Sequence, residues 1–157
     1  MGRDFRYSEI ERDSRALAAC LQQLGLRRGE RIAVMLPNLP QYPVVVAASL
    51  RAGCVLVNVN PLYTPRELEQ QLNDSGASAI VVLEQFAATL QACLARTAVR
   101  HVVLCAVGDM LGPIQGRLVD FVLRHVRKRV PPFELPQALR FNDVLARGRQ
   151  LPLASPA

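Results

Sequence analysis

The feature that most constrains the fold is a regular alternation of short apolar runs with helical patterns. Four runs of five or six mostly apolar residues occur, at 31–36, 54–59, 79–83 and 100–105. Such runs are typical of strands buried on both faces, and strand–helix alternation favours parallel pairing with right-handed crossovers. The sequence therefore predicts an α/β fold, a layered and mainly parallel sheet with flanking helices.

Capping signals mark the predicted helices. Thr64 is followed by Pro65 and Glu67, which predicts an N-cap, a first helical residue and a capping box, and Gly76 is expected to end that helix near Asp74. Further helices are expected from an N-cap at Ser8 to Gly25, over 42–50 and over 86–94. Each therefore lies between two predicted strands or before the first one.

The character of the chain changes after residue 107. Gly and Pro at 108, 112 and 113 predict a loop, and 115–130 has the pattern of an amphipathic, basic helix that Pro131 and Pro132 end. A short helix is expected at 141–145. The sequence predicts one domain over 1–149 and a disordered tail over 150–157, which has no packing pattern.

Composition bounds the class of protein. Half of the residues are hydrophobic and only 20% are charged, which excludes a disordered chain. Charges or prolines interrupt every apolar run before it reaches the length that crosses a bilayer. The four cysteines are widely separated within apolar stretches, so we expect buried, reduced thiols in a cytoplasmic protein and no metal site.

The sequence lacks the residue patterns that are typical of catalytic or phosphate-binding sites. The sequence has no glycine-rich phosphate loop and no nucleophile elbow. His101 and His125 lack a nearby partner for a catalytic pair, so structural or surface roles are expected. Glu9, Glu11 and Asp13 are interpreted as a solvated charged face of the first helix. Catalytic, cofactor-binding and metal residues are therefore predicted as none.

Three long segments nevertheless carry a family resemblance. They lie in one order along the chain and read MLPN at 35–38 with QYP at 41–43, NVNPLYTPREL at 58–68, and QLNDSGASAI at 71–80. These segments resemble the bacterial long-chain fatty acyl-CoA synthetases, members of the adenylate-forming, AMP-binding enzymes, and the likeness extends over about 5–149. The resemblance implies that the chain equals the first N-terminal subdomain of that fold.

The resemblance also implies what a complete enzyme does. A fatty acid carboxylate attacks the α-phosphorus of ATP to give an acyl-adenylate, and the CoA thiolate then displaces AMP. Such an enzyme uses ATP, Mg²⁺ and CoA, through a Ser/Thr/Gly-rich phosphate loop, a ribose-binding Asp and a mobile Lys. None of these has a counterpart here, so we expect this chain to bind no cofactor and to catalyse no adenylation alone.

The basic helix is the one segment with an expected role of its own. Its predicted apolar face holds Leu118, Val119, Val122, Leu123, Val126 and Val130. Five residues are candidates for contact with an anionic membrane surface: Arg117, Phe121, Arg124, Arg127 and Lys128. The alternative is an ordinary surface helix that packs its apolar face on the sheet. The resemblance implies a cytoplasmic protein that is peripheral on the inner face of the membrane.

Partners follow from the same observations. The net charge of +6 lies almost wholly in 100–157, but one basic cluster with one aromatic predicts no nucleic-acid binding. An incomplete sheet would leave an edge uncovered, so self-association is expected.

Two functional classes stay open at this stage. The first is a truncated fatty acid–CoA ligase, which would need the missing region to use fatty acid, ATP and CoA. The second is a non-catalytic membrane-surface or protein-interaction module.

Overall fold

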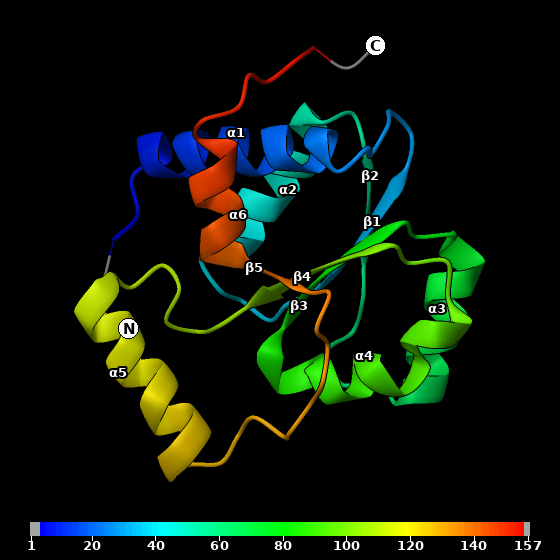
Figure 1. The fold of residues 1–157 in the computed structure, drawn as a ribbon, viewed down its shortest axis with the longest axis vertical. Coiled ribbons are helices and arrows are strands. Elements are labelled where there is room, and N and C mark those ends of the chain that lie inside the picture. Colours follow the sequence, from blue (N-terminus) through cyan, green and yellow to red (C-terminus); the bar gives the residue numbers. More distant parts are fainter. Residues whose placement is uncertain (1–3, 156–157) are drawn as a thin grey trace.

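A five-stranded, wholly parallel sheet forms the centre of the computed structural model, which describes residues 4–155 (Figure 1). The strand order is β2-β1-β3-β4-β5. The strands are β1 (Arg31–Met35), β2 (Val55–Asn58), β3 (Ala79–Leu83), β4 (His101–Cys105) and β5 (Leu139–Arg140). The predicted α/β class and parallel pairing are confirmed.

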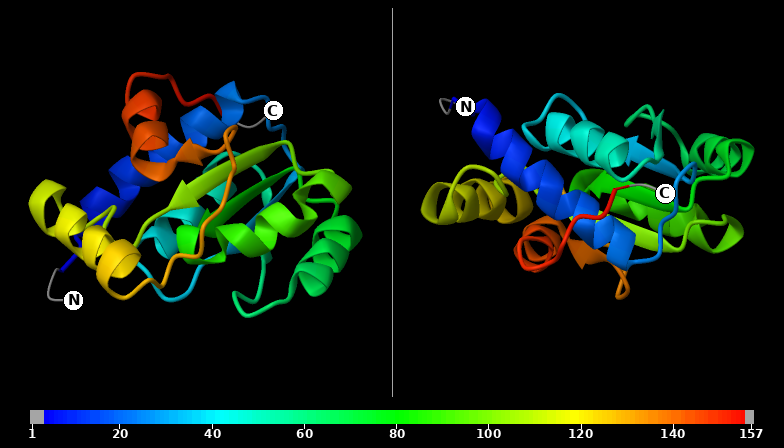
Figure 2. Two further views of the ribbon diagram at one scale, coloured as in Figure 1. Left: turned by 60° about the horizontal axis from the view of Figure 1, so that its bottom comes forward. Right: turned by 90° about the horizontal axis from the view of Figure 1, so that it is seen from above.

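Helices cover both faces of this sheet (Figures 1 and 2). The helices on one face are α1 (Tyr7–Gln23), α2 (Gln41–Arg51) and α6 (Phe141–Gly148), and those on the other are α3 (Pro65–Ser75) and α4 (Ala87–Cys93). Short 3-10 turns, Glu84–Phe86 and Leu94–Arg96, flank α4. Each face therefore has its own apolar core, as expected for a sheet buried on both sides.

Local signals explain where α3 begins and ends. The Glu67 N–H donates to Thr64 Oγ1 at 3.3 Å, and the Thr64 N–H donates to Glu67 Oε2 at 2.8 Å, which completes the predicted capping box. Gly76 ends the helix with a φ of 66°, in the left-handed region that glycine tolerates without strain. The capping prediction is therefore confirmed at both ends.

The beginning of α1 differs from the prediction. The helix starts at Tyr7, so Ser8 lies inside its first turn and Arg6 occupies the N-cap position. The Arg6 N–H donates to Glu9 Oε2 at 2.9 Å, so a carboxylate within the first turn satisfies the backbone donor of the N-cap residue. The prediction of Ser8 as the N-cap is therefore wrong by two residues.

The charged face predicted for α1 is only partly exposed. Asp13 is 4% exposed and accepts hydrogen bonds from Arg12 at 3.0 Å and from Arg149 at 3.2 Å. Arg149 follows α6, so this carboxylate joins the two ends of the chain. The interpretation of Asp13 as a solvated residue is wrong, because α6 packs across α1 and covers it.

The predicted basic helix is shorter than 115–130. Helix α5 (Pro113–Phe121) begins with a proline at the first helical position and continues as a π-helical turn over Val122–Val126. Lys128 then takes a φ of 47°, which ends the helical path before the two prolines. Figure 1 shows this helix beside the sheet, at the end where the strands finish, and not on either face.

The C-terminal segment is attached to α1. Ala154 N–H donates to Gln22 Oε1 at 3.1 Å, Gln22 Nε2 donates to the Ala154 carbonyl at 2.8 Å, and Leu153 packs against the core. This corrects the expectation of a tail without packing for residues 151–155. The last two residues of that predicted tail lie outside the described part of the chain.

Candidate functional site

The strand order locates where a ligand site is expected. From β1 the chain first crosses to β2 on one side and then to β3, β4 and β5 on the other, so β1 and β3 flank the point where the direction of winding changes. In open parallel sheets, ligands bind outside the carboxyl ends of the strands at such a point. A ligand site is therefore expected beside the segments that follow β1 and β3, and the loop after β4 lies next to them in the strand order.

A buried carboxylate lies directly after β3. Glu84 is 3% exposed, and Arg124 donates to both of its oxygens, from Nε to Oε1 at 2.9 Å and from a terminal nitrogen to Oε2 at 2.7 Å. Arg140 adds a third hydrogen bond to Oε2 at 3.1 Å. A buried charge is tolerated only when it is paired and hydrogen-bonded, and this bidentate geometry meets that condition.

Two more carboxylates hold the loop that follows β4. Asp109 Oδ2 accepts from the Ala106 N–H at 2.7 Å, and Asp120 Oδ1 accepts from the Gly108 N–H at 2.8 Å. Burial raises the pKa of Asp109 from 3.8 to about 6, and it raises the pKa of Asp120 as well. Nearby negative charges, including Glu84, act in the same direction.

A hollow of about 430 Å³ opens beside these carboxylates. Its lining residues are Gly108, Asp109, Gly112, Pro113, Gly116, Arg117, Asp120 and Asn142. The lining has no thiol or hydroxyl nucleophile beside a base, and its two carboxylates already accept backbone hydrogen bonds. Asp109 and Asp120 therefore hold the fold of this loop through their backbone hydrogen bonds.

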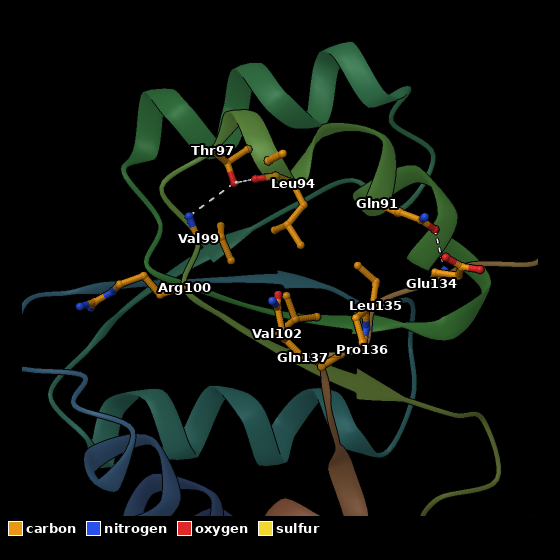
Figure 3. A pocket seen from close by; sticks show the side chains of 12 residues that line it. Gln91, Leu94, Thr97, Val99, Arg100, Val102, Glu134, Leu135, Pro136 and Gln137 are labelled. Atoms are coloured by element: carbon orange, nitrogen blue, oxygen red, sulfur yellow. Dashed lines mark hydrogen bonds between the residues drawn. The ribbon is translucent and has the colours of Figure 1, made fainter.

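A second hollow of about 450 Å³ lies at the open side of β4 (Figure 3). Leu94, Val99, Val102 and Leu135 contribute apolar lining, and at its rim Gln91 Oε1 accepts from the Glu134 N–H at 2.7 Å. It exists because β5 pairs with β4 only at Val103 and Leu104, so the beginning of β4 has no neighbouring strand on this side. No catalytic pair lines it.

The structure separates the five residues predicted for a membrane surface. Arg117, Arg127 and Lys128 are exposed, and none of the ion pairs among residues 4–155 engages them. The Phe121 side chain is exposed and its ring lies 4.8 Å from that of His125. Arg124 is also exposed, but its guanidinium group pairs with Glu84, so it differs from the other three cations in having a carboxylate partner.

The apolar residues of α5 also differ from the prediction. Ile114, Leu118, Phe121 and Val126 are 85%, 62%, 57% and 68% exposed, and within α5 only Gly116 is buried. Ile114, Leu118 and Phe121 are spaced as neighbours on one helix face. We call these four residues the apolar ridge. The alternative in which the apolar face packs on the sheet is wrong for Leu118 and Val126.

Cysteine and metal chemistry receive no support from the geometry. All four cysteines are buried and unpaired, and burial raises the pKa of each thiol, which disfavours the reactive thiolate. Among the described residues, no three His, Cys, Asp or Glu side chains lie close enough together to hold a metal ion. No helix in this part of the chain has the length and apolar character needed to cross a bilayer.

Comparison with known proteins places the chain in a family. The family model described as AMP-binding enzyme matches residues 1–141. Solved structures with the same fold include an anthranilate CoA ligase in complex with anthranoyl-AMP, with a TM-score of 0.73 and 17% identity over 98% of this chain and 25% of that one. A long-chain-fatty-acid-CoA ligase from Archaeoglobus fulgidus has a TM-score of 0.69 and 22% identity, over 99% of this chain and 27% of that one. The chain belongs to the AMP-binding, adenylate-forming enzymes.

Within that family, the similarity is strong to one kind of ligase. A long-chain-fatty-acid–CoA ligase of Escherichia coli O157:H7 is 51% identical over 157 residues, which cover 99% of this chain and 28% of the relative. The ligase of the same name from Haemophilus influenzae is 51% identical over 150 residues, or 95% of this chain and 27% of the relative. The resemblance to the long-chain branch is confirmed, and the chain spans about 28% of the length of such relatives.

Proposed function

We propose that this chain is the N-terminal scaffold of a long-chain fatty acid–CoA ligase. The observation that carries the proposal is the 51% identity to such a ligase over nearly the whole chain. In the complete enzyme, a fatty acid carboxylate attacks the α-phosphorus of ATP and pyrophosphate leaves. The CoA thiolate then attacks the acyl carbon, and AMP leaves as the acyl-CoA forms.

The described residues do not fit ATP or Mg²⁺. A triphosphate needs free cations and backbone N–H groups arranged around it. At the carboxyl edge of the sheet, Arg124 and Arg140 are already bound to Glu84, and Asp109 and Asp120 are bound to the loop. Arg117 is then the only cation among the residues that line the hollow there, which is too few for three phosphates. This arrangement supports the proposal that 1–149 acts as scaffold and that the chain alone is inactive.

Pyrophosphate exchange tests that proposal directly. The chain is incubated with palmitate, ATP, Mg²⁺ and labelled pyrophosphate, and a complete long-chain ligase serves as the positive control. We expect no labelled ATP above the protein-free blank. Exchange that scales with the concentration of this chain would contradict the assignment as scaffold without an active site.

A second proposal concerns the apolar ridge, which we assign to contact with an anionic lipid surface. Ile114, Leu118, Phe121 and Val126 are exposed, and the unpaired cations Arg117, Arg127 and Lys128 lie on the same segment. Exposed apolar side chains beside cations complement the acyl and phosphate layers of a bilayer, and each cation near the surface contributes about 1 kcal/mol. The protein would then be cytoplasmic and peripheral on the inner face of the membrane.

Vesicle flotation distinguishes the apolar contribution to lipid binding from the contribution of the charges. Binding to phosphatidylglycerol vesicles is expected at low salt and not to neutral phosphatidylcholine vesicles. Leu118→Asp should abolish it through the apolar term, and Arg127→Glu should weaken it through the charge. Arg66→Glu, on the exposed surface of α3, is the matched control. Equal flotation of all three variants would contradict docking by the ridge.

The open edge of β2 supports a proposal of self-association. Val55 on this strand and the neighbouring Leu50 and Leu62 are 49%, 67% and 84% exposed. A strand edge with exposed apolar side chains is a template for pairing with another chain. Sedimentation equilibrium should show association that weakens in Val55→Lys. A monomer at all concentrations would contradict this proposal.

A further inference from the structure

The chain between β4 and β5 is attached to the rest of the molecule in an unusual way. We call residues 106–138 the arm. It leaves the sheet after Cys105, forms α5 and the π-helical turn, and returns to β5 (Figures 1 and 2). Over 113–126, only Gly116 is buried, while Val119, Val122 and Leu123 are half-buried. Little apolar burial therefore holds the helical part of the arm in place.

One buried carboxylate supplies the ionic attachment of the arm. Glu84, which directly follows β3, binds Arg124 in the helical part of the arm and also Arg140 of β5, just beyond the arm. The side chain of Glu84 is 3% exposed, whereas those of Arg124 and Arg140 are 38% and 48% exposed. The sheet layer thus presents a buried anion to which the arm contributes one cation, Arg124, and β5 the other, Arg140.

Backbone contact also fixes the start of α5, but it does so within the arm itself. Gly108 and Gly116 approach so closely that a Cβ on either residue would overlap the carbonyl group of the other. The Asp120 carboxylate also accepts from the Gly108 N–H at 2.8 Å. Both contacts lie within the arm, so they fold it onto itself. Glu84 is the buried polar group that joins the helical part of the arm to the sheet.

We propose that Glu84 is a latch that keeps the helical part of the arm, residues 113–126, closed and can release it while the sheet stays folded. Closed, this part holds Arg124 on Glu84 and keeps Val119, Val122 and Leu123 half-buried. Released, it would present those residues together with the apolar ridge and add one free cation. Glu84 would thereby restrain lipid contact. This regulatory role rests on the proposed membrane docking, but the opening itself does not.

Hydrogen exchange by mass spectrometry tests the latch in the unmodified chain and in two variants. In the unmodified chain, amides of 113–126 should exchange faster than those of β1 and β3. Glu84→Gln should speed exchange over 113–126 by roughly tenfold or more, because it removes the anion from two guanidinium groups. Exchange over 79–83 should stay unchanged, which separates local release from global unfolding.

Two further variants supply an independent test of the latch and a matched control. Arg124→Gln breaks the latch from the arm side, without altering the residue next to β3, and should reproduce the faster exchange if Glu84→Gln fails to fold. Glu69→Gln, which breaks an exposed pair with Arg96, is the matched control and should leave 113–126 unchanged. Unaltered exchange in Arg124→Gln, or equal acceleration in β3, would overturn the latch.

Vesicle binding tests the regulatory part separately. If the unmodified chain binds phosphatidylglycerol vesicles, Glu84→Gln should bind about fivefold more tightly, which is the factor that one added cation contributes. An arm that opens without tighter binding would overturn the regulation and leave the latch standing. A chain that binds no vesicles in any form would contradict the proposed docking, and the exchange result alone would decide the latch.

Discussion

Gly148 of α6 rests on the backbone of α1 at Ala16. A Cβ built on Gly148 would overlap the Ala16 carbonyl oxygen, so the two helices cross at a distance that only glycine permits. Gly148→Ala should therefore push α6 away from α1 and lower the free energy of unfolding by about 2–3 kcal/mol. Urea denaturation measures the change. Ala146→Ser, on the exposed side of α6, should stay within about 0.5 kcal/mol of the unmodified chain.

Gly116 offers a test in which two effects oppose each other. Replacing a helical glycine by alanine favours the helix by about 1 kcal/mol. Here the new Cβ would overlap the Gly108 backbone, and neither partner is a flexible side chain that can move aside. We expect the overlap to prevail, so that Gly116→Ala makes the arm more sensitive to limited proteolysis. Greater resistance than the unmodified chain would contradict the close contact, and Gln115→Ala, with an exposed side chain, is the control.

The raised pKa of Asp109 predicts a pH dependence of stability. Because its pKa is about 6 in the folded chain against an ordinary 3.8, the folded state binds the proton more tightly. This contribution to stability is fully present below about pH 4 and is lost as the pH rises to 6. Asp109→Asn keeps an acceptor for the Ala106 N–H and removes the charge. It should raise the free energy of unfolding at pH 7.5 by about 1–2 kcal/mol.

Urea titrations at pH 4.5 and pH 7.5 measure this effect. The gain from Asp109→Asn should be clearly smaller at pH 4.5, where the carboxyl group of the unmodified chain is largely protonated in the folded state. Asp143→Asn, at an exposed position in α6, provides the matched control for loss of one negative charge. A gain of the same size at both pH values would show that burial of Asp109 is not its cause.

Thr64 allows the capping box to be tested by itself. Thr64→Ala removes the oxygen that accepts from the Glu67 N–H and should cost about 1 kcal/mol of stability. Thr64→Ser keeps that oxygen and should restore most of the loss. Thermal unfolding followed by circular dichroism compares the two, and equal melting temperatures for Ser and Ala would show that the cap contributes nothing.

Local signals accounted for much of the fold in advance. The four long strands, the cap at Thr64 and the glycine stop at Gly76 depend on neighbours within a few residues, so the sequence displays them directly. β5 was missed because two residues carry no periodicity, and they form a strand only through the edge of β4. The predicted cap at Ser8 failed because Glu9 supplies the acceptor from within the helix.

The candidate site was far less predictable. Glu84 follows an apolar strand and resembles any loop carboxylate, while its partner Arg124 is 40 residues away in the sequence. The amphipathic pattern of 115–130 correctly marked a helix, but it placed Leu118 inward and gave no sign that Arg124 pairs with Glu84. Periodicity shows which residues share a helix face, and it does not show which face the protein covers. Only the three-dimensional position of the buried anion decides that.

The crossing of α1 and α6 has a consequence for how the chain folds during its synthesis on the ribosome. The buried Asp13 and its partner Arg149 are separated by 136 residues, so α1 is made long before the helix that covers it. At about 5–20 residues per second, that part of α1 waits on the order of ten seconds for its cover. During this interval Asp13 has only its neighbour Arg12 as a partner, and the apolar side chains that α6 covers face the solvent. The N-terminal helix is therefore the segment of the nascent chain that a chaperone would have most reason to bind.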